Sequence, residues 1–292
     1  MRIQRLDQDT KKNLLEDLLK RSPNQYSAYE KDVAKILEDV KREGDEALFG
    51  YTARFDGAHL DAETVQVTEQ EIQEAYDQVD EELLGIIRRA LHNIRTYHEK
   101  QRQNSWFDSR PDGIILGQKV TALARVGVYV PGGKAAYPSS VLMNIAPAKA
   151  AGVDEIIMVT PPDKNGKVTP TTLVAAKEAG ADVVYKIGGA QAIGALAYGT
   201  ESIPKVDKIV GPGNIYVALA KKAVYGHVSI DAIAGPSEIL VIADDSANPS
   251  YVAADLLSQA EHDELASAIL VTTSEELADA VSKAVSYTHL RA

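Results

Sequence analysis

Gln259 and His262 lie three residues apart in a stretch that we predict to be helical, over residues 248–262. Side chains at this spacing share one face of a helix, so both could reach the same ligand. An imidazole nitrogen is a good zinc ligand, and a side-chain amide oxygen can serve as a harder one. A zinc site needs about four ligands, so the others would come from elsewhere in the protein. The spacing alone favours two ordinary surface residues over a metal site.

Three glycine-rich segments each follow a predicted strand. They are Pro131-Gly-Gly-Lys134, Gly188-Gly-Ala-Gln191 and Gly211-Pro-Gly-Asn214. Glycine lets backbone N–H groups approach a phosphate closely, at the positive end of the helix that follows. Taken one at a time, these glycines are better explained as tight turns, which a fold of this kind requires.

The usual dinucleotide-binding fingerprint is incomplete in this chain. Gly211-Pro-Gly213 begins like one, but Tyr216 stands where the third glycine is expected. An NAD site would therefore use another arrangement. Asp231 lies at a plausible distance along the chain for a ribose contact, but spacing alone does not assign it that role.

Strands and helices alternate from residue 125 onwards, and a glycine follows most of the helices. We predict strands over residues 126–130, 155–160, 182–187, 208–210, 239–243 and 268–271, and helices over 140–151, 171–179, 190–198, 215–225, 249–262 and 274–285. This alternation predicts a parallel sheet covered by helices. Ligands of such sheets bind beyond the carboxyl ends of the strands, which is where the three glycine-rich segments fall.

The first 119 residues are rich in charge and mostly helical in pattern. Apolar spacing predicts helices over residues 32–51 and 81–101, a short strand over 64–67 and a helix from Glu69. Trp106 follows the long helix in a predicted loop, and we expect it to be a buried packing anchor.

Composition excludes several classes of protein. The net charge of -11 lacks the electrostatic attraction on which nucleic-acid binding depends. No apolar run approaches the length of a membrane span, and residues 1–20 carry no secretory signal pattern. There is no cysteine, which excludes disulfides and thiolate chemistry. We expect a cytoplasmic protein with no nucleic-acid or membrane partner.

Several sequence blocks, in this order, resemble histidinol dehydrogenases. They are residues 96–101 (TYHEKQ), 105–106 (SW), 125–134 (RVGVYVPGGK), 188–199 (GGAQAIGALAYG), 210–214 (VGPGN), 231–238 (DAIAGPSE) and 255–262 (DLLSQAEH). The resemblance covers nearly the whole chain up to about residue 285.

The resemblance implies a zinc-dependent, NAD-linked enzyme that oxidises L-histidinol to L-histidine through the aldehyde, the last step of histidine biosynthesis. It implies that Tyr129, Gln191 and Asn214 contact NAD. It also implies that Ser237, Gln259 and His262 contact the substrate, and that Gln259 and His262 are zinc ligands.

The resemblance further implies a chain truncated at its C-terminus. The family's catalytic Glu-His pair and its remaining zinc ligands would lie beyond residue 292, so we expect this chain to be inactive alone. Family members are homodimers that share active-site residues. Without cysteine, water would attack the aldehyde intermediate directly.

With this resemblance, we expect the α/β class, with a helical N-terminal region and two incomplete Rossmann-like parallel-sheet domains. Residues 1–25 would form a helical arm, 26–120 and 238–285 the first domain, 121–237 the second, and 286–292 a non-native tail. Two alternatives remain open. One is a non-catalytic nucleotide-binding α/β protein, and the other is a different dehydrogenase on a similar sheet.

Overall fold

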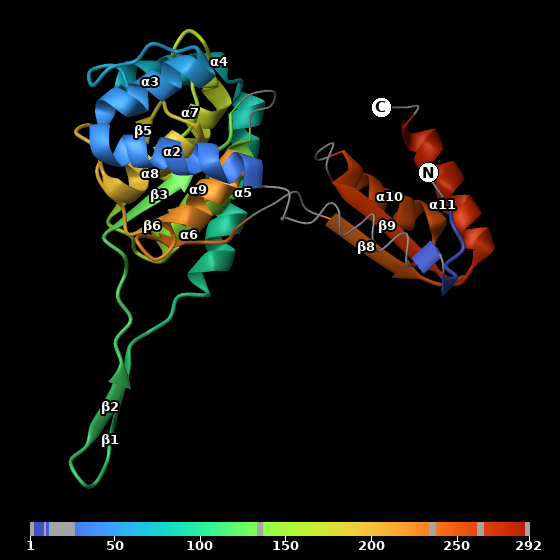
Figure 1. The fold of residues 1–292 in the computed structure, drawn as a ribbon. Coiled ribbons are helices and arrows are strands. Elements are labelled where there is room, and N and C mark those ends of the chain that lie inside the picture. Colours follow the sequence, from blue (N-terminus) through green and yellow to red (C-terminus); the bar gives the residue numbers. More distant parts are fainter. Residues whose placement is uncertain are drawn as a thin grey trace. The chain divides into compact units, whose positions relative to one another are not determined.

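The computed structural model describes residues 3–8, 10–11, 27–132, 137–233, 238–261 and 266–289. The chain divides into two compact units, Ser27–Ile233 and the combination of Met1–Tyr26 with Ala234–Ala292. We call them the large unit and the small unit. Each contains a parallel sheet packed against helices, so the predicted α/β class is confirmed (Figure 1).

The large unit is built on a five-stranded parallel sheet with the order β5-β4-β3-β6-β7. Its strands are β3 (Arg125–Tyr129), β4 (Glu155–Val159), β5 (Val183–Tyr185), β6 (Lys208–Val210) and β7 (Ser229–Ile230). The chain moves outward from β3 to β5 and then returns to place β6 on the other side of β3. This order creates a topological switch point between β3 and β6, the position at which open α/β sheets bind their ligands.

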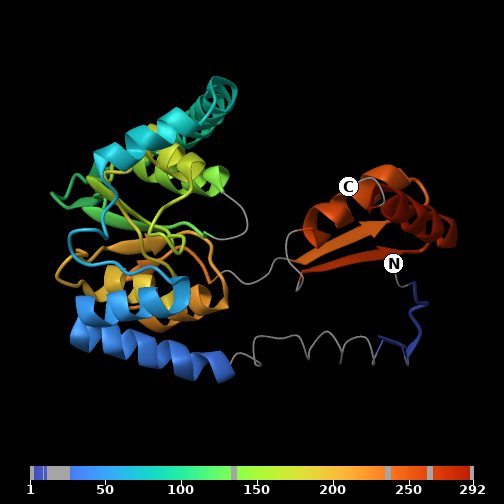
Figure 2. The ribbon, with the colours of Figure 1, turned by 90° about the horizontal axis from the view of Figure 1, so that it is seen from above.

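Helices cover both faces of this sheet (Figure 2). One layer contains α4 (Glu69–Gln78), α5 (Glu81–Glu99), α6 (Pro138–Ala150) and α7 (Pro170–Ala179). The other contains α2 (Ser27–Glu43), α3 (Asp45–Asp56), α8 (Gly189–Tyr198) and α9 (Ile215–Val224). Because both faces are buried, the strands read as continuous apolar runs, which made them recognisable in the sequence.

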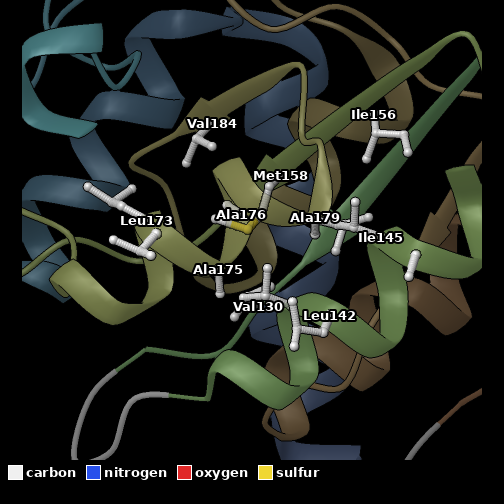
Figure 3. Packing of buried hydrophobic residues seen from close by; sticks show 14 of the residues in the cluster. Val130, Leu142, Ile145, Ile156, Met158, Leu173, Ala175, Ala176, Ala179 and Val184 are labelled. Carbon is white, nitrogen blue, oxygen red and sulfur yellow. The ribbon is translucent and has the colours of Figure 1, made fainter. Parts of the chain in front are cut away.

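Strand alternation sends neighbouring side chains of β3 and its extension to opposite faces. Val126, Val128 and Val130 join the apolar cluster under α5, α6 and α7 (Figure 3). Gly127 faces the other layer, where an added Cβ would lie 2.8 Å from Leu196 of α8. Tyr129 shares that second face by the same alternation, and this places its ring beside α8.

The single helix predicted over residues 32–51 is wrong, because the structure has two helices that meet at Gly44. Gly44 has φ 57°, and the Glu201 carboxylate accepts a hydrogen bond from the Asp45 backbone N–H at 2.8 Å. That carboxylate caps the start of α3, which is a tertiary contact that apolar spacing does not reveal.

The strand predicted over residues 64–67 is reduced to one antiparallel bridge between Gln66 and Tyr185. Two further hydrogen bonds flank it, from the Val67 N–H to the Val184 carbonyl and from the Lys186 N–H to the Val65 carbonyl. The segment therefore closes the β5 edge of the sheet.

Trp106 is not a buried anchor, and that prediction is wrong. It begins β1 (Trp106–Ser109), which pairs with β2 (Ile115–Gln118) in an antiparallel hairpin, and it is 55% exposed. All residues of the 101–124 segment are exposed, and Figure 1 shows the hairpin extending away from the helices of the large unit. Isolated hairpins are marginally stable, so this arm offers apolar surface for further packing.

The small unit contains β8 (Glu238–Ala243) paired in parallel with β9 (Ser267–Thr272). Helices α10 (Pro249–Ala260) and α11 (Glu275–His289) cover one face around Val252, Leu256 and Val281. The other face leaves Leu240 and Ile242 exposed.

Residues 27–120 pack with 121–233, because α2 lies on α8 and α9, and α5 lies on α6. The expected pairing of 26–120 with 238–285 stays a prediction. Of the expected arm over residues 1–25, all but residues 3–8 and 10–11 lies outside the described residues.

Candidate functional site

A cavity of about 760 Å³ opens at the carboxyl ends of the strands beside the switch point. We call it the switch-point cavity. Its wall includes Tyr129, Pro131 and Gly132 after β3, Pro161 and Pro162 after β4, Gly189 to Gln191 at the start of α8, Asn214 and Tyr216 beyond β6, and residues of α2 and α3. This volume is within the usual range of small-molecule and cofactor sites. The structure therefore brings together Tyr129, Gln191 and Asn214, the three residues singled out for NAD.

Gln191 is the third residue of α8 and is only 1% exposed. Neither its amide oxygen nor its amide nitrogen has a hydrogen-bond partner within the described part of the chain. A buried amide left unpaired costs about 1–3 kcal/mol. A ligand that brings both a donor and an acceptor would remove this cost.

The first turn of α8 owes its shape to glycine. Gly189 has φ 65°, and an added Cβ would lie 2.6 Å from the Gln191 Oε1 atom. An added Cβ at Gly188 would lie 2.5 Å from Pro161 Cβ. The backbone at the positive end of α8 therefore packs closely against Pro161, and Gly189 and Ala190 line the cavity.

Tyr129 lines the cavity and is 3% exposed. Its phenol oxygen accepts a hydrogen bond from the Gly189 backbone N–H at 3.1 Å. Burial raises the pKa of Tyr129 to about 12, and the nearby Asp56 carboxylate adds to the rise. The phenol therefore stays protonated at neutral pH and keeps its own hydrogen available to donate.

Asn214 has a structural role as well as a place in the cavity wall. Its Oδ1 atom caps α9 by accepting hydrogen bonds from the backbone N–H groups of Tyr216 and Val217, at 3.1 and 3.2 Å. The capping leaves the Nδ2 donors as the part of the side chain that a ligand can use.

Asp231 is not part of the cavity wall. Its carboxylate accepts a hydrogen bond from the Gly211 N–H at 2.8 Å and forms an ion pair with Lys221, whose side chain is 2% exposed. Lys221 in turn donates to the Gly211 carbonyl at 2.9 Å. Asp231 therefore holds the loop that carries Asn214.

Asp56 is a cavity residue that the sequence analysis missed. It ends α3, and its Oδ2 atom is buried without a partner among the residues that the structure describes. Burial raises the pKa of this carboxyl to about 6. One sequence signal was available, because an aspartate in the last turn of a helix opposes the helix dipole.

The unpaired buried atoms are concentrated at this site. Five such side-chain atoms occur in the described ranges, and three of them, Asp56 Oδ2 and both Gln191 amide atoms, belong to residues that line the switch-point cavity. Together with the glycine backbone, they suit a ligand rich in hydroxyl, amide and phosphate groups.

Of the predicted substrate and zinc residues, Gln259 belongs to the described part of the small unit. Ser237 and His262 lie outside the described residues. Gln259 is in the last turn of α10, and its amide nitrogen is buried and unpaired with respect to the described residues. No group of three or more histidine, cysteine, aspartate or glutamate side chains able to hold a metal occurs in the ranges that the structure describes, which omit His262.

The sheet order and the cavity define a class, the α/β proteins with a Rossmann-like sheet and a ligand space at its switch point. Among the described helices, none has the length and apolar character needed to span a bilayer. The histidinol dehydrogenase family model matches residues 19–291, and the chain belongs to the histidinol dehydrogenase family.

Relatives of this chain carry the same family name. It is 61% identical to the histidinol dehydrogenase of Bacillus subtilis (strain 168) over 255 residues, which are 87% of this chain and 59% of that protein. It is 58% identical to the histidinol dehydrogenase of Aquifex aeolicus over 287 residues, or 98% of this chain and 66% of that protein. The chain thus spans about 59% of the length of the Bacillus relative.

A solved structure shares the fold. The crystal structure of histidinol dehydrogenase from Elizabethkingia anophelis superimposes with a TM-score of 0.84 at 42% identity, covering 90% of this chain and 60% of that one.

Proposed function

We propose that this chain is part of an NAD-linked histidinol dehydrogenase and that the switch-point cavity binds the NAD. The observation that carries the proposal is Gln191, a fully buried amide with no partner among described residues, at a helix start beside the switch point. Family membership supports the same conclusion. When bound, NAD supplies the hydride acceptor for oxidation of an alcohol and then of an aldehyde.

Each NAD residue has a role that its position supports. Gln191 offers an amide nitrogen that donates and an amide oxygen that accepts, both unpaired among the described residues. Tyr129 can donate its hydroxyl hydrogen, and Asn214, the N-cap of α9, can donate from its amide nitrogen. The positive end of α8, where Gly189 and Ala190 line the cavity, suits a pyrophosphate.

For substrate and metal binding, we propose that Ser237, Gln259 and His262 bind L-histidinol and that Gln259 and His262 are also zinc ligands. The buried amide of Gln259, unpaired in the described chain, supports a ligand at the end of α10. Zinc would hold and orient the substrate, acting as a Lewis acid. The acid and base that move protons would come from beyond residue 292 in the longer protein.

We further propose a cytoplasmic homodimer. The β1–β2 hairpin supports a dimer, because Phe107 and Ile115 are 69% and 67% exposed on an element that needs further packing. Light scattering after gel filtration tests this: Phe107→Ser with Ile115→Ser should shift a dimer toward monomer, and a monomeric parent would contradict it.

Enzyme assays test the activity directly. A protein of family length that contains this segment should, when loaded with zinc, reduce NAD on addition of L-histidinol, measured as NADH absorbance. NAD binding without NADH formation would instead favour the non-catalytic nucleotide-binding alternative. Gln259→Ala in that protein should lower zinc content at least about tenfold by elemental analysis.

A further inference from the structure

The switch-point cavity holds an acidic group that none of the proposed NAD contacts uses. Asp56 lines the cavity, and its Oδ2 atom is buried with no donor from the described residues. A buried carboxylate oxygen without a donor is unfavourable, and a ligand hydroxyl or amino group would remove the penalty.

Aromatic surface lies directly before Asp56 in the chain. The rings of Tyr51 and Phe55 stack at 5.6 Å with 14° between their planes, and Phe55 remains 52% exposed. The Arg54 guanidinium lies 5.4 Å from the Phe55 ring centre. Purine bases stack on aromatic and guanidinium surfaces of this kind.

Partial burial distinguishes Asp56 from the other charged residues of the cavity wall. Asp32, Lys35 and Arg54 also line the cavity but are exposed, and Lys35 pairs with Asp39 at 2.7 Å. Asp56 alone among these four is partly buried, and it is close enough to Tyr129 for its charge to act on the phenol. Asp56 is therefore the partly buried acid of the wall, and the Arg54 cation lies on its neighbour Phe55.

We infer that Phe55 and Asp56 form the adenosine subsite of the proposed NAD site, and that Asp56 selects NAD over NADP. The purine stacks against Phe55 and Arg54, and the Asp56 carboxylate accepts a hydrogen bond from the ribose 2′-hydroxyl. NADP carries a phosphate at that position, which removes the donor and places an anion against the carboxylate. The inference rests on the proposed function, because it assigns one half of the same ligand.

Calorimetric titration of NAD and of NADP into this chain at pH 8 tests the subsite. The parent should bind NAD at least about tenfold more tightly than NADP, as expected for one charged hydrogen bond. Asp56→Asn should weaken NAD binding about tenfold and bring NADP to within about threefold of NAD. Asp154→Asn, an exposed acid outside the cavity, should leave both affinities unchanged.

The outcomes separate this inference from the proposed function. If the parent binds NAD and Asp56→Asn binds it equally well, or if the parent binds NADP as tightly as NAD, the subsite is refuted while the NAD site stands. If the parent binds neither nucleotide, both are refuted. Melting temperatures check that each variant is folded; if Asp56→Asn melts below the parent, Asp56→Ser is titrated in its place and judged by the same criteria.

Discussion

The phenol oxygen of Tyr129 accepts a hydrogen bond from the backbone N–H of Gly189 at 3.1 Å, which ties the end of β3 to the first turn of α8. Residues of both elements line the switch-point cavity. The same contact orients the phenol toward the ligand space and fixes the turn that presents Gln191.

Tyr129→Phe removes the acceptor and leaves the Gly189 N–H unpaired. We expect a loss of about 1 kcal/mol in the free energy of unfolding, and NAD binding weakened by severalfold. Urea unfolding and calorimetry measure the two effects. Tyr225→Phe is the matched control, because Tyr225 is 68% exposed and lies outside the cavity. Equal behaviour of the two variants would contradict the role given to Tyr129.

Gly189→Ala places a Cβ where φ is 65° and where Gln191 Oε1 would be 2.6 Å away. We expect a loss of about 1–2 kcal/mol in unfolding free energy, together with weaker NAD binding because Gln191 must move. Gly85→Ala in α5 is the control, since nothing lies within 4 Å of its added Cβ. That helical substitution should stabilise the protein by about 0.5–1 kcal/mol. Stabilisation by both variants would show that the turn is not strained.

Lys221→Met leaves Asp231 without its cation and the Gly211 carbonyl without a donor. Lys221 is 2% exposed, so we expect a loss of about 3 kcal/mol in unfolding free energy. Lys222→Met removes the neighbouring Lys222–Glu30 pair, which is 56% and 48% exposed, and should change stability by less than about 1 kcal/mol. Chemical denaturation measures the unfolding free energy of both variants. A smaller loss for Lys221→Met than for Lys222→Met would contradict the stabilising role given to the contacts of Lys221 with Asp231 and Gly211.

The pKa of Asp56 is raised from 3.8 to about 6 in the folded chain. The folded state then binds the proton more tightly than the unfolded state, so this stabilisation is complete below pH 3.8 and is lost as pH rises through about 6. Because the carboxyl is partly open to the cavity, Asp56→Asn should stabilise the ligand-free chain by only about 1 kcal/mol at pH 8. At pH 4 the difference should largely vanish. Urea unfolding at both pH values measures it, and a pH-independent difference would contradict the shift.

Much of the sheet could be predicted because strands buried on both faces appear in the sequence as continuous apolar runs. The strands expected at 126–130, 155–160 and 208–210 match β3, β4 and β6 to within one residue at each end. The helix predicted from residue 249 begins there as α10, and the Asn248 Oδ1 atom caps it by accepting from the Ser250 N–H. The helix predicted over 274–285 is present as α11, and the Ser274 hydroxyl before it accepts from the Leu277 N–H.

The features that were missed depend on contacts between distant segments. The break at Gly44 depends on Glu201, which lies far along the chain. The exposure of Trp106 could not be predicted, because a tryptophan in a soluble protein is usually well buried. Asp56 was missed because only the folded chain places it beside Tyr129. The meeting of Tyr129, Gln191 and Asn214 was expected from the resemblance, and their contacts with NAD stay predictions.

The central claim is that the switch-point cavity binds NAD through Gln191, and calorimetric titration of NAD into the parent chain and Gln191→Leu tests it most directly. The account predicts one NAD per parent chain and binding at least about tenfold weaker in Gln191→Leu. The leucine variant should also melt higher without ligand, because an unpaired buried amide has been replaced by an apolar side chain of similar size. Gln191→Leu that binds NAD as tightly as the parent would contradict the account.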